Sequence, residues 1–164
     1  MSDQILNTII ENSYTLHELR KRVRILKAFI SKKLYGSDTT EMDLEIRTEI
    51  NWLYQLGDSF FTQFNQSNFS QLFQELEIRI NHLSPLIIYF AFEPNIVELN
   101  NVGSWLRKNY GPQFIFDHKL DPSLIAGCAL VWKGVYRDYS LRSKIEQNRQ
   151  GIIQVIRASI NSNK

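Results

Sequence analysis

The sequence is short of the residue types that build chemical sites. Its 164 residues include one cysteine, three histidines and seven glycines. The single cysteine, Cys128, cannot form an internal disulfide bond. Because it lies in an apolar run, we predict a small buried side chain rather than a reactive thiol. A reducing compartment fits this composition best.

Motifs of metal, nucleotide and nucleophile sites are also missing. The histidines, His17, His82 and His118, are scattered, and no cysteines or carboxylates have the spacing of metal ligands. No glycine-rich loop could cradle a phosphate, and no Gly-x-Ser-x-Gly turn could hold a nucleophilic serine. We therefore expect a non-catalytic protein that needs no cofactor and no metal.

Long apolar runs and export signals are missing as well. The longest apolar run, residues 86–92, has seven residues, whereas a helix that crosses a bilayer needs about 20. Residues 1–4 lack the basic and apolar parts of a signal peptide. We expect no direct membrane insertion and no export.

What remains is the composition of an ordinary globular protein, with charge that changes sign along the chain. The sequence is 43% hydrophobic and 22% charged, with a net charge of +2. Residues 20–33 contain seven cations, residues 38–58 contain six acids and one arginine, and residues 133–164 contain seven cations and two acids. Such alternation suits neighbouring helices that attract one another, or surfaces that face charged partners.

Residues 1–84 have the apolar periodicity of helices. Thr15 and Glu18 form a capping box, and Gly36 stands where a helix should stop. A short amphipathic helix is expected before Thr15, a further helix from about Thr40 to Phe64, and another from Asn68. Short links between them predict a small antiparallel bundle.

Residues 85–164 change to a mixed pattern, which predicts a small α/β domain with a mixed sheet. The expected elements are a buried strand at 86–92, a capped helix at 95–110, strands at 113–120, 124–133 and 135–139, and a long final helix from Ser140 that Gly151 loosens. Lys133 and Gly134 should form the hairpin turn between the last two strands. The predicted fold class is therefore α+β, with an N-terminal helical bundle, a small α/β domain and a long C-terminal helix.

Several surfaces could contact partners. The final helix has an apolar stripe at Ile152, Ile156 and Ile160, which either folds back on the sheet or meets a partner helix. The basic stretch 20–33 is best interpreted as a solvated helix face, although a phosphate- or protein-binding face remains an alternative. The three tryptophans, Trp52, Trp105 and Trp132, fall at apolar positions and are expected in the core.

The most distinctive sequence segment in the chain is residues 121–145. Aspartate before proline favours a turn, a glycine within a strand suggests a bulge, and Asp138 and Ser140 offer oxygens to a helix N-terminus. This text resembles the C-terminal signature of the delta subunit of F-type ATP synthases, called the oligomycin sensitivity-conferring protein in mitochondria. The matching residues are Asp121, Pro122, Ser123, Leu124, Ile125, Gly127, Asp138 and Ser140.

The order of expected elements also agrees with that family. Ala126 and Tyr139 stand where the family has glycine, and the helical half is shorter than the family's six-helix bundle. The resemblance is therefore to a divergent bacterial member.

The resemblance implies a stator subunit, present in one copy per complex and forming no homo-oligomer. Residues 1–84 would bind N-terminal segments of the alpha subunits on the catalytic head. Residues 85–164 would meet the C-terminal helices of the b subunits in the peripheral stalk. The protein would lie at the cytoplasmic face of the bacterial cell membrane and would not bind nucleic acid.

Two alternatives stay open. A basic nucleic-acid-binding adaptor would use residues 20–33, and a peripheral-stalk subunit of a vacuolar or archaeal rotary ATPase would combine helices with a small α/β end. The text at 121–125 favours the F-type subunit over the latter.

Overall fold

The computed structural model describes residues 2–36 and 50–162. Their contacts divide the chain into two compact units, which are described separately below. The first unit comprises Met1–Leu83 and Asn100–Ile115, and the second comprises Ser84–Leu99 and Phe116–Lys164. Both α-helices and a sheet are present, so the predicted α+β fold class is confirmed.

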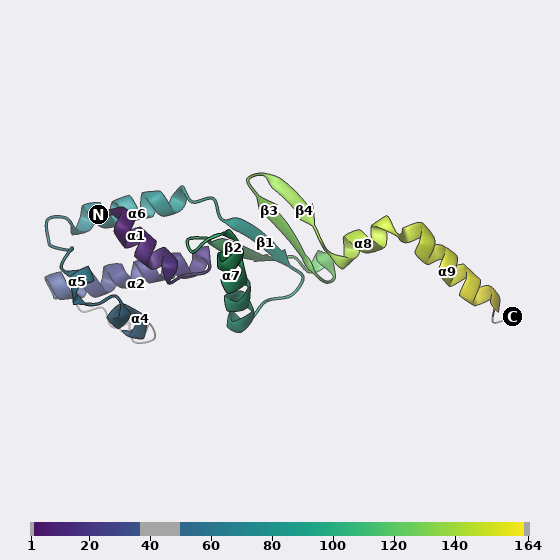
Figure 1. Ribbon diagram of the computed structural model, residues 1–164, viewed down its shortest axis with the longest axis horizontal. Coiled ribbons are helices and arrows are strands. Elements are labelled where there is room, and N and C mark those ends of the chain that lie inside the picture. Colours follow the sequence, from purple (N-terminus) through teal and green to yellow (C-terminus); the bar gives the residue numbers. More distant parts are fainter. Residues whose placement is uncertain (1, 37–49, 163–164) are drawn as a thin grey trace. The chain divides into compact units, whose positions relative to one another are not determined.

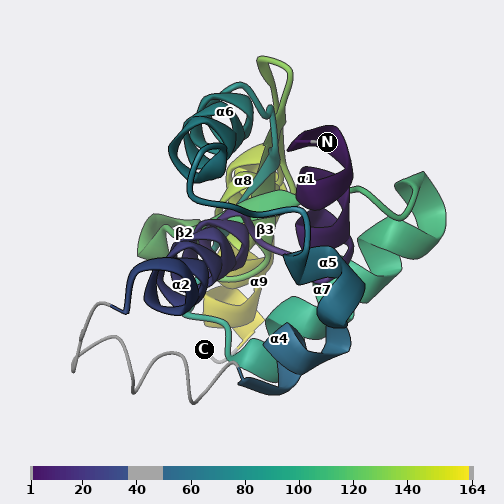
Figure 2. The same cartoon turned by 90° about the vertical axis from the view of Figure 1, so that its left-hand side faces the viewer.

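The first unit is built mainly from helices (Figure 1). Its helix α1 packs against both α2 and α6. Figure 2 looks along α2 and shows α6 above it, as Figure 1 does. The described helices of residues 2–83 are α1 (Ser2–Glu11), α2 (Leu16–Tyr35), α4 (Ile50–Gln55), α5 (Asp58–Phe61) and α6 (Phe69–Asn81).

Helix α2 begins and ends as the sequence predicts. The Thr15 hydroxyl accepts a hydrogen bond from the Glu18 backbone N–H at 3.1 Å, and the Glu18 carboxylate accepts one from the Tyr14 N–H at 2.9 Å. At the other end Gly36 adopts a φ of 67°, and its N–H donates to the Lys32 carbonyl. These bonds satisfy backbone groups that a helix end would otherwise leave open.

The core of the first unit is apolar and rich in phenylalanine. Four of its side chains are completely buried: Ile5, Ile9, Leu26 and Phe73. The ring of Phe64 stacks on that of Phe73, with 5.8 Å between ring centroids. Burying side chains of this size stabilises a fold by about 1.5–3 kcal/mol each.

The helix expected from Thr40 to Phe64 is wrong as a single element. Its start lies outside the described residues. Within the described part, α4 ends at Gln55, and Gly57, with a φ of 73°, separates it from α5. A left-handed residue cannot continue a right-handed helix, and glycine adopts that conformation without a steric penalty.

The second unit contains a four-stranded mixed sheet. Its strand order is β2-β1-β3-β4; β1 and β2 are parallel, and the other neighbouring pairs are antiparallel. Lys133 and Gly134, with φ values of 49° and 79°, form the predicted hairpin turn. The strands are β1 (Leu86–Phe90), β2 (Phe116–Leu120), β3 (Cys128–Trp132) and β4 (Val135–Asp138).

Helix α7 (Ile96–Tyr110) connects the parallel strands and has residues in both units. The expected capping box is present: the Asn95 N–H donates to the Glu98 carboxylate at 2.8 Å, and the Asn95 side-chain oxygen accepts from the Glu98 N–H at 3.0 Å. Strand β2 starts three residues later than predicted, because the Phe114 N–H closes a turn on the Gly111 carbonyl at 3.1 Å.

The final helix is divided in two. Helix α8 (Leu141–Gln147) ends at Asn148, and α9 (Arg149–Ser162) follows. The expected weak point, Gly151, lies inside α9. The break is at Asn148, where the backbone leaves the helical conformation with a φ of −103° and a ψ of 12°. The Asn148 side-chain amide donates to the Lys144 carbonyl at 2.9 Å, a local bond that competes with regular helix.

The tryptophan prediction was correct for one residue of three. Trp52 is buried, whereas Trp105 and Trp132 are 58% and 40% exposed. Trp105 packs at the surface against Tyr110 of its own helix, and Trp132 lies under the Lys133 ammonium. Local partners of this kind let an aromatic ring stay outside the core.

Candidate protein-binding surfaces

Asp121 begins a tight turn directly after β2. Its carboxylate oxygen Oδ1 accepts hydrogen bonds from both the backbone N–H and the hydroxyl of Ser123, at 3.0 and 2.6 Å. Its own N–H donates to the Phe90 carbonyl at 2.8 Å. Pro122 then starts a short 3-10 helix, η1 (Pro122–Leu124). The sequence Asp-Pro-Ser therefore forms a turn that is hydrogen-bonded to the sheet through the Asp121 N–H.

The next residues pass directly under the start of α8. Ile125 has a φ of 69°, a rare conformation for a β-branched residue. Gly127 has a φ of 82°, and a Cβ atom there would lie 2.7 Å from the Tyr139 carbonyl oxygen. The Ala126 carbonyl accepts from the Leu141 N–H at 2.8 Å. Only glycine fits at 127, because the backbones are in contact there.

Asp138 and Ser140 cap α8. The Asp138 carboxylate accepts from the Ser140 N–H at 2.8 Å, and the buried Ser140 hydroxyl oxygen accepts from the Ser143 N–H at 3.1 Å. Hydrogen bonds from the Ser140 hydroxyl and N–H hold the pKa of Asp138 below its usual value. Arg142 donates to the Ser123 hydroxyl at 3.2 Å and closes the junction between η1 and α8.

The structure thus places all eight residues of the sequence motif in one junction, which we call the α8 junction. It joins η1, β3 and β4 to the first turn of α8, and its polar atoms bond to one another or to backbone. Within residues 2–36 and 50–162, no three histidine, cysteine, aspartate or glutamate side chains gather as a metal site. Cys128 is half-buried, not fully buried as predicted. Burial raises the pKa of its thiol, as does the charge of Asp138, so the protonated form is favoured at neutral pH.

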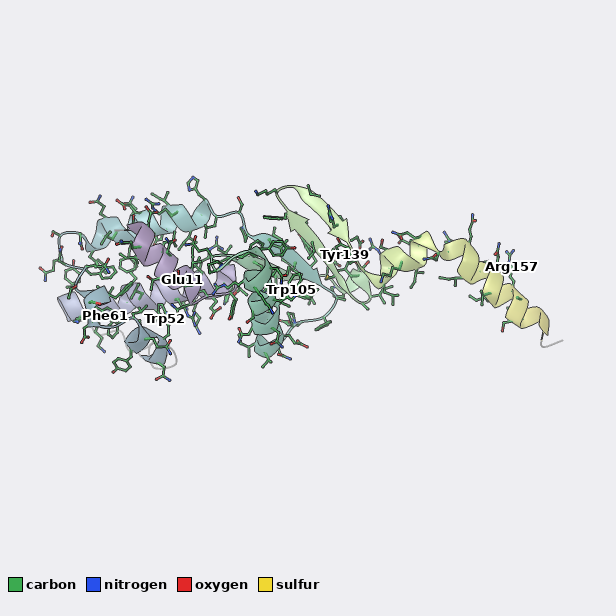
Figure 3. The ribbon with its side chains drawn as sticks, viewed as in Figure 1. Glu11, Trp52, Phe61, Trp105, Tyr139 and Arg157 are labelled. Atoms are coloured by element: carbon green, nitrogen blue, oxygen red, sulfur yellow. The ribbon has the colours of Figure 1, made fainter. Side chains whose placement is uncertain are left out.

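The junction leads into a helical surface that its unit does not cover. Every residue of α9 from Arg149 to Ile160 is exposed. The stripe residues Ile152, Ile156 and Ile160 are 40%, 53% and 61% exposed, and Figure 3 shows Arg157 projecting from the same helix. A shallow hollow of about 410 Å³ on this face is lined by Asn148, Gly151, Ile152, Val155 and Ile156.

The stripe continues onto α8 and has a basic border. Leu141 and Ile145, four residues apart on α8, are 42% and 40% exposed. Ile145 precedes Ile152 by seven residues, about two helical turns, and the break at Asn148 lies between them. Residues 141–160 contain four cations, Arg142, Lys144, Arg149 and Arg157, and one acid, Glu146. An amphipathic helix with an apolar stripe and acidic flanks would complement this surface.

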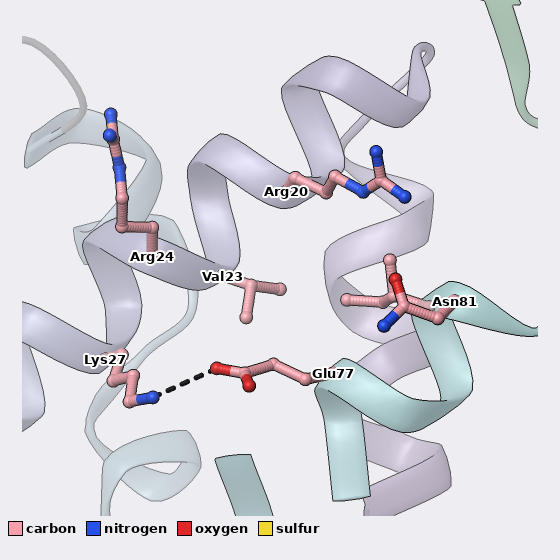
Figure 4. Close-up of a pocket in the computed structure, with 7 residues that line it drawn as sticks. Arg20, Val23, Arg24, Lys27, Glu77 and Asn81 are labelled. Atoms are coloured by element: carbon pink, nitrogen blue, oxygen red, sulfur yellow. Dashed lines mark hydrogen bonds and ion pairs between the residues drawn. The ribbon is translucent and has the colours of Figure 1, made fainter. Parts of the chain in front are cut away.

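A second surface is the groove between α2 and α6 in the first unit (Figure 4). It holds about 320 Å³, and two of its lining residues, Val23 and Ile80, are buried apolar side chains. The ammonium of Lys27 forms an ion pair with Glu77 across it at 2.9 Å. The lining residues are Arg20, Val23, Arg24, Lys27, Glu77, Ile80 and Asn81. We call this surface the α2–α6 groove.

The aromatic rings near the basic stretch are engaged inside the first unit. Phe29 packs on Phe61 at 5.3 Å between centroids, and Tyr35 packs on Phe69 at 5.8 Å. Binding of single-stranded nucleic acid relies on aromatic rings that face outward to stack on bases. These two rings therefore give no such platform.

Sequence reasoning missed Arg107, on α7. Its guanidinium donates to the Glu11 carbonyl at 2.6 Å and to the carbonyls of Ile10 and Ser13. Burial lowers the pKa of Arg107, opposed by the nearby Tyr14 and Glu18 side chains. One sequence signal was available: Gly103, one turn earlier, marks a place on α7 where another segment approaches closely.

The comparisons with known proteins agree with the motif. No family model matches the chain. It is 31% identical over 83 residues to a protein called ATP synthase subunit delta from Verminephrobacter eiseniae (strain EF01-2), covering 51% of this chain and 45% of that protein. It is 27% identical over 81 residues to a protein of the same name from Polaromonas naphthalenivorans (strain CJ2), covering 49% and 45%.

The chain therefore spans less than half the length of the curated relatives it matches. The resemblance expected from residues 121–140 is confirmed at that level: over about half of its length, this chain is similar to ATP synthase subunit delta.

Proposed function

We propose that this chain is a non-catalytic stator subunit of an F-type ATP synthase. It links the α/β catalytic head to the peripheral stalk of b subunits and resists the torque of the rotor. Its similarity to two proteins named ATP synthase subunit delta supports this role. The structural observation that carries the proposal is the exposed apolar stripe on α8 and α9, anchored to the sheet by the α8 junction.

A stator joint needs affinity and stiffness rather than a reactive group. Ile152, Ile156 and Ile160 recur at the spacing by which one helix packs along another. Full burial of one such side chain contributes about 1.5–3 kcal/mol. Three of them, at the centre of an interface, suffice to anchor a partner helix.

The partners follow from this role. Residues 85–164 bind the C-terminal helices of the b subunits, and residues 1–84 bind N-terminal segments of the alpha subunits. One copy serves each complex, as a peripheral subunit at the cytoplasmic face of the bacterial membrane. None of the described helices is both long enough and apolar enough to cross a membrane.

The proposal is tested by affinity capture. The full chain, tagged in its own host, is purified from detergent-solubilised membranes, and the bound proteins are identified by mass spectrometry. The alpha and b subunits should be recovered together with it. Recovery of neither would overturn the proposal.

A filter-binding titration addresses the nucleic-acid alternative. A nucleic-acid-binding adaptor would show a steep loss of affinity for nucleic acid as the salt concentration rises. The engaged Phe29 and Tyr35 rings favour a protein partner instead, so no saturable binding is expected at physiological salt.

A further inference from the structure

We propose that β4 is a docking edge, to which an extended segment of a partner protein adds as one more strand. β4 is the last strand in the order β2-β1-β3-β4, so only one of its two sides is bonded within the described sheet. Figure 1 shows β4 in the hairpin that it forms with β3. The strand shares no residue with the stripe on α8 and α9 and is independent of the proposed stalk contacts.

Two residues of β4 direct their backbone hydrogen-bonding groups away from the sheet. The Tyr139 N–H donates to the Cys128 carbonyl at 2.9 Å, so Tyr139 faces β3. In an antiparallel ladder alternate residues face the neighbouring strand, and every second residue before Tyr139 therefore faces β3 as well. The N–H and carbonyl groups of Tyr136 and Asp138 point to the open side, where an added strand would bond to them.

The side chains along β4 are more apolar than those of the opposite edge strand. Val135, Tyr136 and Tyr139 are at least 50% exposed. The pairing of β4 with β3 has no bulge, and the strand contains no proline. In β2, by contrast, the three central residues are Asp117, His118 and Lys119. Charged residues protect an edge strand from pairing, so β4 is the edge to which a further strand adds more readily.

Arg137 sets the charge of the segment that fits. Its side chain is exposed and forms no ion pair within the part of the chain that the structure describes. The neighbouring Asp138 carboxylate accepts from the Ser140 N–H at 2.8 Å and lies on the other face of the sheet. A carboxylate on the added strand, directly opposite Arg137, therefore gives this cation a partner.

The residues beside Arg137 define the rest of the segment. Val135 and Tyr139 lie two positions to each side of Arg137, on the same face of the sheet. A segment with a carboxylate at its centre and an apolar side chain two residues before and after it contacts all three. On the other face the Tyr136 ring favours a β-branched neighbour. The occupant is therefore an extended segment in which apolar residues flank an acidic one at alternate positions.

A second copy of this chain fits the edge less well. A two-fold axis at Arg137 places that cation opposite its own copy, and an axis at Asp138 does the same for the carboxylate. An axis at Tyr136 avoids both conflicts but pairs only residues 134–138. Such a pairing buries far less than the roughly 1,200 Å² of a stable interface. A segment of a partner that also binds elsewhere gains instead from a high effective concentration.

The probe is a fluorescein-labelled nine-residue peptide with glutamate at its centre, valine two positions to each side, and threonine between them. Fluorescence anisotropy with the full chain should show weak, saturable binding. A peptide with glutamine at its centre should bind about fivefold more weakly, because it lacks the charge opposite Arg137.

Two N-methylated peptides test whether main-chain pairing carries the binding. In an antiparallel pair the N–H groups of the two threonines beside the glutamate face β4, and the glutamate N–H faces away. Methylation of the two threonine nitrogens should therefore abolish binding. Methylation of the glutamate nitrogen is the control and should leave affinity within about threefold.

A proline variant tests the same bonds from the side of the protein. Tyr136→Pro removes an N–H that points to the open side and leaves the bonds between β4 and β3 intact, and proline is tolerated at such edge positions. It should abolish binding of the glutamate peptide. Tyr136→Thr, which keeps the N–H and is similar in size to proline, should bind within about threefold of the unmodified chain.

A charge reversal tests the role of Arg137. Arg137→Glu should weaken binding of the glutamate peptide by about fivefold or more, and it should bind a peptide with lysine at the centre better than the unmodified chain does. Arg157→Glu makes the same charge change on α9 and should leave affinity for the glutamate peptide within about twofold. Equal losses in the two variants would assign the attraction to overall charge and remove the proposed role of Arg137.

Three further outcomes would overturn the proposal. Equal binding of the two N-methylated peptides would exclude strand addition, and this result does not depend on the folding of any variant. A dimer in sedimentation velocity that Tyr136→Pro dissociates would make a second copy the occupant. Loss of b-subunit capture together with peptide binding in Tyr136→Pro would make the edge part of the stalk joint. Circular dichroism and the urea midpoint verify that each variant is folded.

Discussion

The guanidinium of Arg107 lies over the ring of Tyr14, with its central carbon 4.5 Å from the ring centroid. The same guanidinium donates to backbone carbonyls at the end of α1. One turn earlier on α7, a Cβ atom at Gly103 would lie only 2.4 Å from the Tyr14 ring. A glycine and an arginine on α7 therefore close the C-terminal end of α1.

Replacing Arg107 should destabilise the first unit. Arg107→Ala removes the donors that bond to the carbonyls of Ile10, Glu11 and Ser13, and hydrogen bonds to a charged group each contribute about 1.5–3 kcal/mol. We expect the free energy of unfolding to fall by at least about 2 kcal/mol in a urea titration followed by circular dichroism. Arg107→Lys should recover little, because an ammonium cannot reach three carbonyls in a fixed plane.

The neighbouring Lys108→Ala is the control, since Lys108 is exposed on the same helix turn. It should change the unfolding free energy by no more than about 0.5 kcal/mol. Equal effects of the two alanine variants would mean that helix propensity or overall charge, and not the cap on α1, explains the loss.

Gly127 should tolerate no side chain. Gly127→Ala adds a Cβ atom 2.7 Å from the Tyr139 carbonyl, at a φ of 82° that alanine rarely adopts. We expect a loss of about 1–3 kcal/mol in the free energy of unfolding. Ala126→Gly is the matched change next to it, in an exposed residue, and should lower stability by at most about 1 kcal/mol. A stable Gly127→Ala protein would show that the approach of the two backbones is looser.

Much of the fold followed from local signals in the sequence. The caps at Thr15, Gly36 and Asn95 and the hairpin turn at Gly134 act through bonds and backbone angles within a few residues, so they could be predicted from single short segments. The contacts of Arg107 join residues more than 90 positions apart, and nothing in a local pattern reports them.

The wrong predictions concern features that a pattern of apolar and polar residues does not report. Apolar periodicity continues through residues 50–64, but Gly57 interrupts the helix within that range. The periodicity therefore predicts which residues are buried, and not where the helix ends. Trp105 looked like a core residue because its type is apolar, but the ring it packs on, Tyr110 of the same helix, is itself 56% exposed. The motif at 121–140 could be recognised from its residue types alone. That it forms a junction with α8 could be seen only from the structure, where the backbones of Gly127 and Tyr139 are in close contact.

The second unit should lose stability in acid through Asp138. Hydrogen bonds from the Ser140 hydroxyl and N–H lower the folded-state pKa of Asp138 relative to the unfolded chain. The folded state then binds fewer protons, so this contribution is complete above the ordinary pKa of aspartate and is lost as the pH falls through the lower folded value. Urea midpoints measured at pH 6, 4 and 3 should therefore decrease toward pH 3.

Asp138→Asn should flatten this pH dependence. The amide oxygen can still accept from the Ser140 N–H, but it has no charge to titrate. Asp58→Asn, which removes a carboxylate from the other unit, is the control. In this variant the urea midpoint of the second unit should still decrease toward pH 3. An unchanged slope in Asp138→Asn would assign the acid sensitivity to other carboxylates.

The apolar stripe of α9 gives the most direct test of the stator proposal. In Ile152→Asp/Ile156→Asp, two carboxylates replace side chains that are already 40% and 53% exposed, so the fold loses little buried surface. The double variant should keep its circular dichroism spectrum and its urea midpoint. Capture of b subunits should be abolished, because an interface core cannot hold unpaired charges.

The matched control is Gln150→Asp/Gln154→Asp, which adds the same two charges on the opposite side of α9. It should keep b-subunit capture within about threefold of the unmodified chain, since charges at the rim of an interface act mainly on association rate. Global unfolding of the Ile152→Asp/Ile156→Asp variant would show that α9 belongs to the core. Loss of capture in both double variants would show that α9 attracts its partner by charge alone, and the stripe would then have no part in the joint.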